Sequence, residues 1–400
     1  MWLLNPAVSD LYPSTIVGNG RAWVIDPFAV ETYYSTLLRW GLDYEVNTNV
    51  NQINKFYPLN QNTVDLMKGD IQRFMVEDRL LYVYQNRAVG QFGIYARFIQ
   101  NNNGASQLVT TNDILTSNNI NYLEGEYGVG TEYCGLVRSK GAHYFADPVR
   151  GAEIRRAGNG LTNITEKHKG QFYIKSLIVP YNKTWTRANG SKAKILGFYN
   201  FVEEEYNTIL QGGTNSGKSI DSYTFSFNEI RNGYCSFYEF YPEWAASAND
   251  IIYTWKNGRI YSHTNTTKYT NFYDVQYYPS IQLVFNEQEG VKKNFNTFAY
   301  QSNQIWVCPE IGDIYTSLID GQTDIRQVSK LPNWAVEIDE DKRIAALLRD
   351  AESMPNTQQA LIEGNFLQGF NIVLNLVYLG NEYSWLYLPY ITWKLNNRQF

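Results

Sequence analysis

The chain has 400 residues, 44% of them hydrophobic, so it can bury a sizeable core and is not a disordered tail. A formal net charge of −5 argues against a protein that wraps nucleic acid, because that task needs an excess of Lys and Arg. The 32 Tyr, 20 Phe and 10 Trp favour β-strands, so we expect a mainly β protein.

The sequence carries no sign of a membrane or secretion signal. No apolar stretch approaches the roughly 18 residues of a membrane-spanning helix, and the start, Met1–Pro6, lacks the basic flank of a signal peptide. Three widely spaced cysteines, Cys134, Cys235 and Cys308, favour a reducing cytoplasm over a disulfide scaffold. We interpret these cysteines as small buried residues and expect assembly in a cytoplasm.

The first predicted element is a helix near the start of the chain. Asp26 can cap this helix, Pro27 suits its first turn, and Gly41 can end it. Between them, apolar side chains recur at helical spacing: Val30, Tyr33, Tyr34, Leu37 and Leu38. Residues 1–43 are therefore expected to form a helical segment.

Strand patterns follow this segment. Ile71–Met75 and Leu80–Tyr84 are short β-rich runs on either side of the polar turn Glu77-Asp78, and Val89–Ile99 is a third run after Asn86-Arg87. The short spacing of these runs predicts a meander of antiparallel strands.

Asn-Gly pairs mark tight turns in the middle of the chain, because this dipeptide accepts the positive φ angles of a two-residue hairpin. They are Asn159-Gly160, Asn189-Gly190, Asn232-Gly233 and Asn257-Gly258. The clearest predicted hairpin runs from Ile251–Trp255 through the last pair to Ile260–Ser262. Further strand groups are expected near 195–206 and 281–300.

The C-terminal region continues the strand pattern. Asp339–Glu352 fits either a helix or a charged edge strand. Farther on, Phe370, Ile372, Leu374 and Leu376 stand at alternate positions. Gly380-Asn381 then predicts a turn, and Trp385–Trp393 a returning strand.

Recurrent β-rich units at irregular intervals favour a β-propeller-like architecture of antiparallel hairpins. A pair of β-sandwiches is the alternative. We expect a propeller-like β domain over residues 44–305 and a C-terminal β module over residues 306–400, after the helical segment 1–43.

Gly212–Ser219 matches the phosphate-binding pattern G-x-x-x-x-G-K-[ST]. In a true site, the backbone N–H groups and Lys218 would hold phosphate, and a helix would begin directly afterwards. Here the continuation, Ile220–Phe227, alternates like a strand. We therefore interpret the match as a flexible loop that joins two antiparallel strands.

We predict no catalytic, cofactor-binding or metal site and no enzyme activity. The three histidines, His143, His168 and His263, form no i, i+4 pair and no cluster with cysteine, so a transition-metal site is not expected. A nucleophile elbow G-x-S-x-G is absent. Asp and Glu are plentiful, but no local pattern selects the two facing carboxylates that a glycosidase needs.

Basic and aromatic residues offer two further candidate surfaces. The clusters Arg150/Arg155/Arg156 and Lys167/His168/Lys169 could contact DNA or an acidic neighbour, but we favour a solvated face because charges alternate along the strands. Trp185, Trp244 and Trp334 could stack on sugars, although a core or subunit-interface position is favoured.

Several stretches resemble the muzzle proteins of crAss-like bacteriophages. The similarity spans roughly residues 44 to 370, and Asp274 stands where that family has glycine. The stretches that carry it are Tyr44–Tyr57, Gly69–Phe74, Asn121–Gly130, Tyr144–Gly151, Gly158–Leu161, Phe225–Glu229, Ser236–Trp244, Trp255–His263, Asn271–Tyr273, Lys292–Asn296 and Ala345–Asp350.

The resemblance implies a structural virion protein in the tail-tip muzzle, or nozzle, ring of a short-tailed phage. Such a ring, with sixfold symmetry favoured, would gate the DNA channel, support genome ejection and contact other tail proteins. DNA would pass without specific binding, and host surface contact is possible. Related podophage nozzle proteins are built on β-propellers. The alternative functions are a tail-borne carbohydrate-active enzyme and a lectin-like receptor-binding module.

Overall fold

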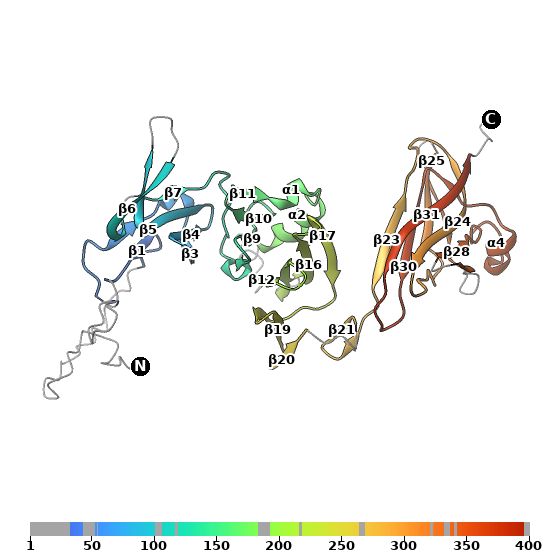
Figure 1. Ribbon diagram of the computed structural model, residues 1–400. Coiled ribbons are helices and arrows are strands. Elements are labelled where there is room, and N and C mark those ends of the chain that lie inside the picture. Colours follow the sequence, from blue (N-terminus) through green and yellow to red (C-terminus); the bar gives the residue numbers. More distant parts are fainter. Residues whose placement is uncertain are drawn as a thin grey trace. The chain divides into compact units, whose positions relative to one another are not determined.

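The computed structural model describes residues 33–42, 53, 55–100, 106–116, 119–182, 193–215, 218–263, 269–320, 323–331, 337–339 and 342–395. This part of the chain is mainly β and divides into two compact units (Figure 1). Unit 1 is Met1–His263 and unit 2 is Thr264–Phe400.

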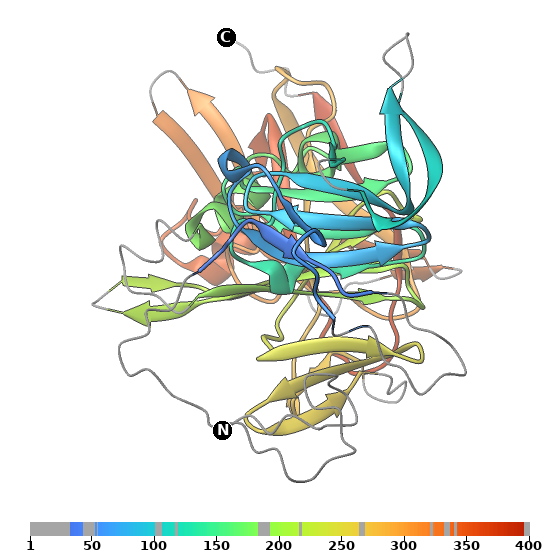
Figure 2. The ribbon, with the colours of Figure 1, turned by 90° about the vertical axis from the view of Figure 1, so that its left-hand side faces the viewer.

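The first sheet of unit 1 confirms the predicted meander. Its strands pair in the order β3-β4-β5-β6, with β7 beside β5, and Figure 2 shows its blue strands side by side. Their bounds are β3 (Ile71–Glu77), β4 (Leu80–Gln85), β5 (Val89–Gln100), β6 (Ser106–Leu115) and β7 (Asn121–Tyr122). A short 3-10 turn, η1 (Leu66–Lys68), precedes β3.

The expected helical segment 1–43 lies mostly outside the described residues, which begin at residue 33. Its described end is not helical, because Leu37–Arg39 forms strand β1, which pairs with β2 (Gln61–Thr63). Leu38 is buried beside Val64 and Val83, whereas Tyr33 and Tyr34 are exposed, so these side chains do not share one buried helical face. This part of the helix prediction was wrong.

The middle sheet of unit 1 has the order β11-β10-β9-β8. The 3-10 turn η2 (Tyr133–Gly135) leads into it, and two short helices and a further 3-10 turn follow it. The strands are β8 (Val137–Arg138), β9 (His143–Asp147), β10 (Ala152–Ala157) and β11 (Gly160–Asn163), and the later turns are α1 (Ile164–Lys167), α2 (Tyr173–Ile178) and η3 (Val179–Tyr181).

A third sheet, in the order β12-β13-β16-β17, and two smaller ones complete unit 1. The turn at Asn257-Gly258, with φ angles of 51° and 73°, confirms the clearest predicted hairpin, whereas Asn189-Gly190 lies outside the described residues. The strands are β12 (Lys194–Asn200), β13 (Glu205–Gln211), β14 (Gly213–Asn215), β15 (Lys218–Ile220), β16 (Tyr223–Asn228), β17 (Gly233–Tyr238), β18 (Trp244–Ala248), β19 (Ile251–Lys256) and β20 (Arg259–Ser262).

The middle sheet is buried on both faces. On one face, Phe145 and Ile154 pack against Tyr84 of the first sheet. On the other face, Tyr144 stacks on Tyr206 of the third sheet with ring centroids 5.0 Å apart. Because neighbouring residues of a strand point to opposite faces, β9 and β10 serve two cores at once.

Unit 2 consists chiefly of two antiparallel sheets that share one core. One has the order β23-β30-β25-β26, and the other the order β27-β28-β24-β29 with β31 also paired to β24. The elements are β21 (Asn271–Phe272), β22 (Val275–Gln276), β23 (Ser280–Phe285), β24 (Lys293–Ser302), β25 (Ile314–Asp320), β26 (Thr323–Ser329), β27 (Glu337–Asp339), β28 (Lys342–Ala346), α4 (Thr357–Glu363), β29 (Gln368–Gly369), β30 (Asn371–Val377) and β31 (Leu386–Leu395).

Two expectations for this region are corrected. The returning strand β31 pairs with β24 and not with β30, because the connection 378–385 carries the chain to the other sheet, where Ile391 is buried beside Phe298. The boundary expected at 305/306 falls inside unit 2, because β24 is the strand to which β28, β29 and β31 all pair.

The remaining fold predictions have mixed outcomes. The charged stretch Asp339–Glu352 contains strand β28 and no helix among its described residues, so a strand is confirmed there. It is not an edge strand, because β28 pairs with β27 on one side and β24 on the other. The described residues show antiparallel sheets but no closed propeller. In unit 2, two sheets around one core agree with the sandwich alternative instead.

Candidate functional site: polar junctions between the sheets of unit 1

Buried charged residues join the middle sheet to both of its neighbours. His143, Asp147, Glu153 and Arg156 are each less than 5% exposed, although they lie on strands β9 and β10 between apolar residues. Charged side chains are rarely buried to this extent unless they are paired. The partners of these residues therefore define the candidate site.

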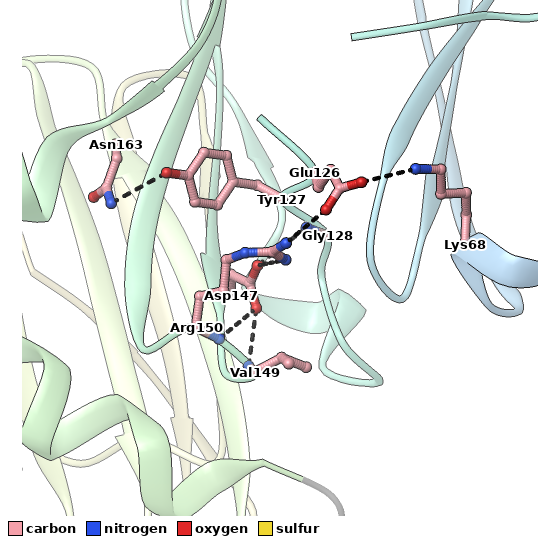
Figure 3. Close-up of polar contacts among 8 residues, drawn as sticks. All are labelled: Lys68, Glu126, Tyr127, Gly128, Asp147, Val149, Arg150 and Asn163. Carbon is pink, nitrogen blue, oxygen red and sulfur yellow. Dashed lines mark hydrogen bonds and ion pairs between the residues drawn. The ribbon is translucent and has the colours of Figure 1, made fainter. Parts of the chain in front are cut away.

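The first junction is centred on Asp147 (Figure 3). Its Oδ1 accepts hydrogen bonds from the backbone N–H groups of Val149 (2.9 Å) and Arg150 (3.1 Å), and its Oδ2 accepts one from Gly128 N–H (3.2 Å). Burial raises the pKa of Asp147, while these bonds and the Arg150 guanidinium act in the opposite direction. The carboxylate thus holds its own turn and the segment from the first sheet together.

A chain of surface ion pairs extends this junction (Figure 3). Arg150 Nη2 lies 3.4 Å from Glu126 Oε2, and Lys68 Nζ lies 3.3 Å from Glu126 Oε1. Glu126 is largely exposed, so these pairs contribute little to stability. Beside them, the Arg150 guanidinium lies over the ring of Tyr127, whose hydroxyl accepts a hydrogen bond from Asn163 Nδ2.

Gly128 occupies a position with no room for a side chain. A Cβ there would lie 2.4 Å from Arg87 N and from Asn86 C, which are backbone atoms of the first sheet's turn. A Cβ at Gly130, two residues on, would lie 2.6 Å from the Pro148 ring, and Gly130 also has a φ angle of 58°. Both glycines lie in the stretch Asn121–Gly130, where Gly128 allows the close approach of two backbones and Gly130 a left-handed conformation beside a proline ring.

The second junction is an ion pair inside the apolar contact of the two sheets. Arg156 Nη2 pairs with Glu77 Oε2 at the end of β3, and the guanidinium lies 3.9 Å from the centroid of the Tyr82 ring. His143 lies beside this pair, with Nδ1 2.7 Å from the Tyr84 hydroxyl. Burial and the nearby Arg138 lower the pKa of His143 to about 4, so the ring is neutral at pH 7.

The opposite face of the middle sheet carries a third junction. Arg155 Nε donates to Glu229 Oε1 (2.7 Å) and to the Tyr144 hydroxyl (3.0 Å), which links β10 to the end of β16. One strand farther, Thr208 donates to the carboxyl group of Glu153. Burial raises the pKa of Glu153 to about 7.

These contacts correct one interpretation of the basic clusters. Arg155 and Arg156 do not form a solvated face, because each is paired with a carboxylate of a neighbouring sheet. Lys167 and Lys169 are exposed, as expected for a solvated face. The sequence did not identify Glu77 and Glu229 as the partners of these arginines. Alternation along a strand shows which residues share a face, but whether that face is covered depends on the neighbouring sheets.

The titration of His143 and that of Glu153 predict opposite pH dependences of the folding stability. The pKa of His143 is lower in the folded state, so its contribution to stability is present above about pH 6.5 and is lost as the pH falls through 4. The pKa of Glu153 is higher in the folded state, so its contribution is present below about pH 4.5 and is lost as the pH rises through 7.

We therefore expect His143→Gln and Glu153→Gln to act with opposite sign. Relative to wild type, His143→Gln should gain about 3 kcal/mol in unfolding free energy between about pH 7.5 and pH 4, and Glu153→Gln should lose a similar amount. Urea unfolding at both pH values measures this. Parallel pH profiles for wild type and both variants would contradict the assignment.

The family-like stretches of β18–β20 also fix backbone turns. Lys256 Nζ donates to Tyr241 O (2.7 Å), and Glu243 Oε1 accepts from Asn257 N–H (3.2 Å). His263 Nε2 lies 2.6 Å from Thr254 Oγ1, and its ring stacks on Phe240. The motif residues here hold a three-stranded sheet and its turns together.

In unit 2, the position at which the family has glycine forms a tight turn. Tyr273 and Asp274, between β21 and β22, have φ angles of 55° and 66°. Glycine adopts this left-handed region without a steric penalty, and aspartate tolerates it. Lys293 of another family-like stretch is almost fully buried, and its Nζ donates to Phe370 O.

The phosphate-loop match lies between two strands. β14 and β15 pair antiparallel with Asn215 opposite Lys218, so a strand stands where a phosphate loop needs the first turn of a helix. This part of the loop interpretation is confirmed. We expect Lys218→Ala to leave the rate of ATP hydrolysis by the purified chain at the wild-type level in a phosphate-release assay; a loss of measurable hydrolysis would contradict this reading.

The other candidate residues are scattered. Cys308 is buried in the core of unit 2, as predicted, whereas Cys134 and Cys235 are only half-buried. Trp244 is 45% exposed, and Trp185 and Trp334 lie outside the described residues. In the described ranges, no three His, Cys, Asp or Glu side chains are grouped as metal ligands, and no helix has the length and apolarity to cross a membrane.

A comparison with protein families assigns one segment. Residues 267–350 match the family model of the Crassvirus muzzle protein C-terminal domain. The segment lies in unit 2 and includes strands β21 to β28. No curated protein matches the chain. The family match confirms the resemblance indicated by the sequence motifs: through residues 267–350 the chain is similar to the muzzle proteins of crAss-like phages, and this similarity supports a structural role in a virus particle.

Proposed function

We propose that the chain is a subunit of the muzzle ring at the tip of a short phage tail, where it helps to gate the DNA channel and supports genome ejection. The match of residues 267–350 to the muzzle C-terminal domain carries this proposal. The proposed partners are further copies of the chain, in a ring with sixfold symmetry favoured, and other tail proteins. DNA would pass through without specific binding, and the tip could contact the host surface.

The surface of unit 2 supports a role in subunit contacts. Tyr387, Leu388 and Tyr390 of β31 are all exposed, and Leu388 is 72% accessible. In the described sheet, β31 pairs only with β24, so its other edge is available to a neighbour. Exposed aromatic and aliphatic side chains on a free edge are typical of protein interfaces.

The buried junctions of unit 1 support a mechanical role. Ion pairs on both faces of the middle sheet connect it to the first and third sheets. The buried pair of Arg156 and Glu77 favours one arrangement, because separating the partners would leave a charge without compensation in an apolar layer, whereas Arg155 and Glu229 are partly exposed. A unit that transmits force in a tail tip needs such fixed contacts between its layers.

Native mass spectrometry of the purified chain tests ring formation. We expect one defined oligomer, with a hexamer favoured, and its loss in the double variant Tyr387→Ser/Leu388→Ser. Ile362→Ser is the matched control, because Ile362 is 73% exposed on α4 of the same unit. A wild-type chain that stays monomeric at all concentrations, or a double variant that assembles normally, would contradict a ring built through β31.

A further inference from the structure

Both sheets of unit 2 end in strand edges that no described strand covers. One sheet ends at β23 and β26, and the other ends at β27 on one side of β24 and at β31 on the other side. Trp393 Nε1 of β31 donates to Glu287 Oε2, just after β23 (3.0 Å). Ser329 Oγ of β26 donates to Leu348 O, just after β28 (2.9 Å). Therefore β23 and β31 border one side of the unit, and β26 and β27 border the opposite side.

The outer backbone groups of β23 have no partner among the described residues. Tyr378 N–H donates to Pro279 O (2.9 Å), so these two residues form a hydrogen-bonded pair next to the ladder between β23 and β30. Hydrogen-bonded and non-hydrogen-bonded pairs alternate along an antiparallel ladder. Ser280, Gln282 and Val284 therefore turn their N–H and C=O groups away from β30, and no described residue bonds to these groups.

The sequence of β23 does not protect this edge. Its six residues, Ser280–Phe285, include no charge, proline or glycine, and its register with β30 has no bulge. Ile281 and Val284 are 39% and 60% exposed, and Tyr278, just before the strand, is 53% exposed. Natural sheets guard their free edges with charges, prolines or bulges, so an apolar edge of this kind indicates a surface that another strand covers.

The opposite edge of the same sheet, β26, has outward backbone groups as well. Val328 N–H donates to Asp350 Oδ1 (3.3 Å), and Val328 O accepts from Ala351 N–H (2.9 Å), so the groups of this residue point away from β25. By the same alternation, Arg326 and Asp324 turn their backbone groups outward. No described residue bonds to those of Arg326, so the available part of β26 begins there.

The directions of β23 and β26 suit each other. Each strand of this four-stranded sheet runs antiparallel to the next, so β23 and β26 point in opposite directions. A second copy placed beside the first without reversal would therefore bring its β26 antiparallel to β23. Gln282 opposite Arg326, with Val284 opposite Asp324, is the register that joins outward groups to outward groups and leaves Val328 with its own partners.

The faces of the two strands agree in this register. Gln282 Nε2 donates to Asn375 Oδ1 of β30 (2.9 Å), and the Arg326 guanidinium lies over the Tyr315 ring of β25. Asn375 and Tyr315 each directly follow a fully buried residue of their strand, so both lie on the face away from the core. The pairing would thus carry the outer face of the sheet from one copy to the next.

We propose that β23 of one copy pairs with β26 of the next, so that this sheet of unit 2 continues around the muzzle ring. The inference rests on the proposed function and names the two surfaces that meet. The contact is head-to-tail, as a closed ring requires, whereas β23 paired with β23 of a second copy would end as a dimer. Because β31 lies on the same side as β23, its exposed residues would face the same neighbour.

Disulfide cross-linking of the full chain tests the pairing with the double variant Gln282→Cys/Arg326→Cys. Within one chain, two strands separate these positions by about 14 Å, too far for a disulfide. Across the proposed contact their Cα atoms would be about 5.5 Å apart, within disulfide reach. We expect oxidation to give a ladder of covalent oligomers that ends at the ring size seen by native mass spectrometry. Each single-cysteine variant, which has the same native cysteines, should give no ladder.

Charge at position 282 tests the register. Gln282→Lys places a cation opposite Arg326 and should raise the chain concentration needed for half-assembly about fivefold. Gln282→Glu changes the same exposed site and should assemble at least as well as wild type. Arg326→Glu should restore the assembly of Gln282→Lys, which it would not do if the lysine merely disturbed folding.

Contrary results overturn separate parts of the account. A defined ring in native mass spectrometry without a cross-linked ladder would overturn the contact between β23 and β26 and leave the proposed function intact. A covalent dimer from Gln282→Cys alone would show that β23 pairs with itself. Equal assembly of Gln282→Lys and Gln282→Glu would contradict the register. A wild-type chain that stays monomeric would contradict both the ring and this contact.

Discussion

Arg156→Met is expected to destabilise unit 1 by about 3–5 kcal/mol, the usual cost of removing one partner of a buried ion pair. Arg156 and Glu77 are 5% and 12% exposed at their side chains, so water cannot replace the lost cation. The substitution also removes the contact between the Arg156 guanidinium and the Tyr82 ring. Amide hydrogen exchange of residues 143–157, followed as urea is added, measures the unfolding free energy of unit 1 alone.

Two further variants separate charge from packing. The double variant Glu77→Leu/Arg156→Met should recover most of the lost stability, because apolar residues of similar volume often replace a buried pair without loss. Arg259→Met removes an exposed arginine and should change stability by less than about 0.5 kcal/mol. If Arg156→Met behaves like Arg259→Met, the pair does not hold the sheets together.

Gly128→Ala is the second substitution with a large expected effect. The new methyl group would lie 2.4 Å from backbone atoms of Asn86 and Arg87, which cannot rotate away as a side chain would. Overpacking of this kind costs about 1–3 kcal/mol, and the shift would also weaken the bond from Gly128 N–H to Asp147. A lower midpoint of urea unfolding with an unchanged slope is the expected result.

Gly158→Ala is the matched control, because no atom lies within 4 Å of a Cβ at that position. It should be neutral or slightly stabilising, since alanine restricts the unfolded chain. Equal effects of the two substitutions would show that Gly128 is not needed for the close approach of the two backbones.

The strands were largely predictable from the sequence. The runs that became β3, β4 and β5, and the hairpin around Asn257-Gly258, follow from alternation and from turn residues, which act within a few positions of each other. The same local argument separated the Lys218 loop from a phosphate site, because a strand follows it.

The candidate site was not predictable in the same way. Arg155 and Arg156 look like surface residues until Glu229 and Glu77, more than 70 positions away in the chain, are placed beside them. The strand β31 shows the same limit, since alternation identifies a strand but not the sheet that it joins. Contacts distant in sequence decide both cases.

The family-like motifs gain a physical meaning from the structure. Gly128 marks a close approach of two backbones, Asp147 caps a turn, and Asp274 stands in a left-handed turn where the family has glycine. These are requirements of backbone geometry and buried charge. In this chain, residues of the family-like stretches therefore hold sheets and turns in place.

Immunogold electron microscopy of intact particles, with an antibody that recognises the native chain, tests the central claim most directly. Gold confined to the tail tip is the predicted result and would place the chain in the muzzle. Gold on the capsid or the fibres would contradict a tail-tip role and assign the chain to another structural part. Absence of label from particles that the antibody can reach would contradict the structural role itself.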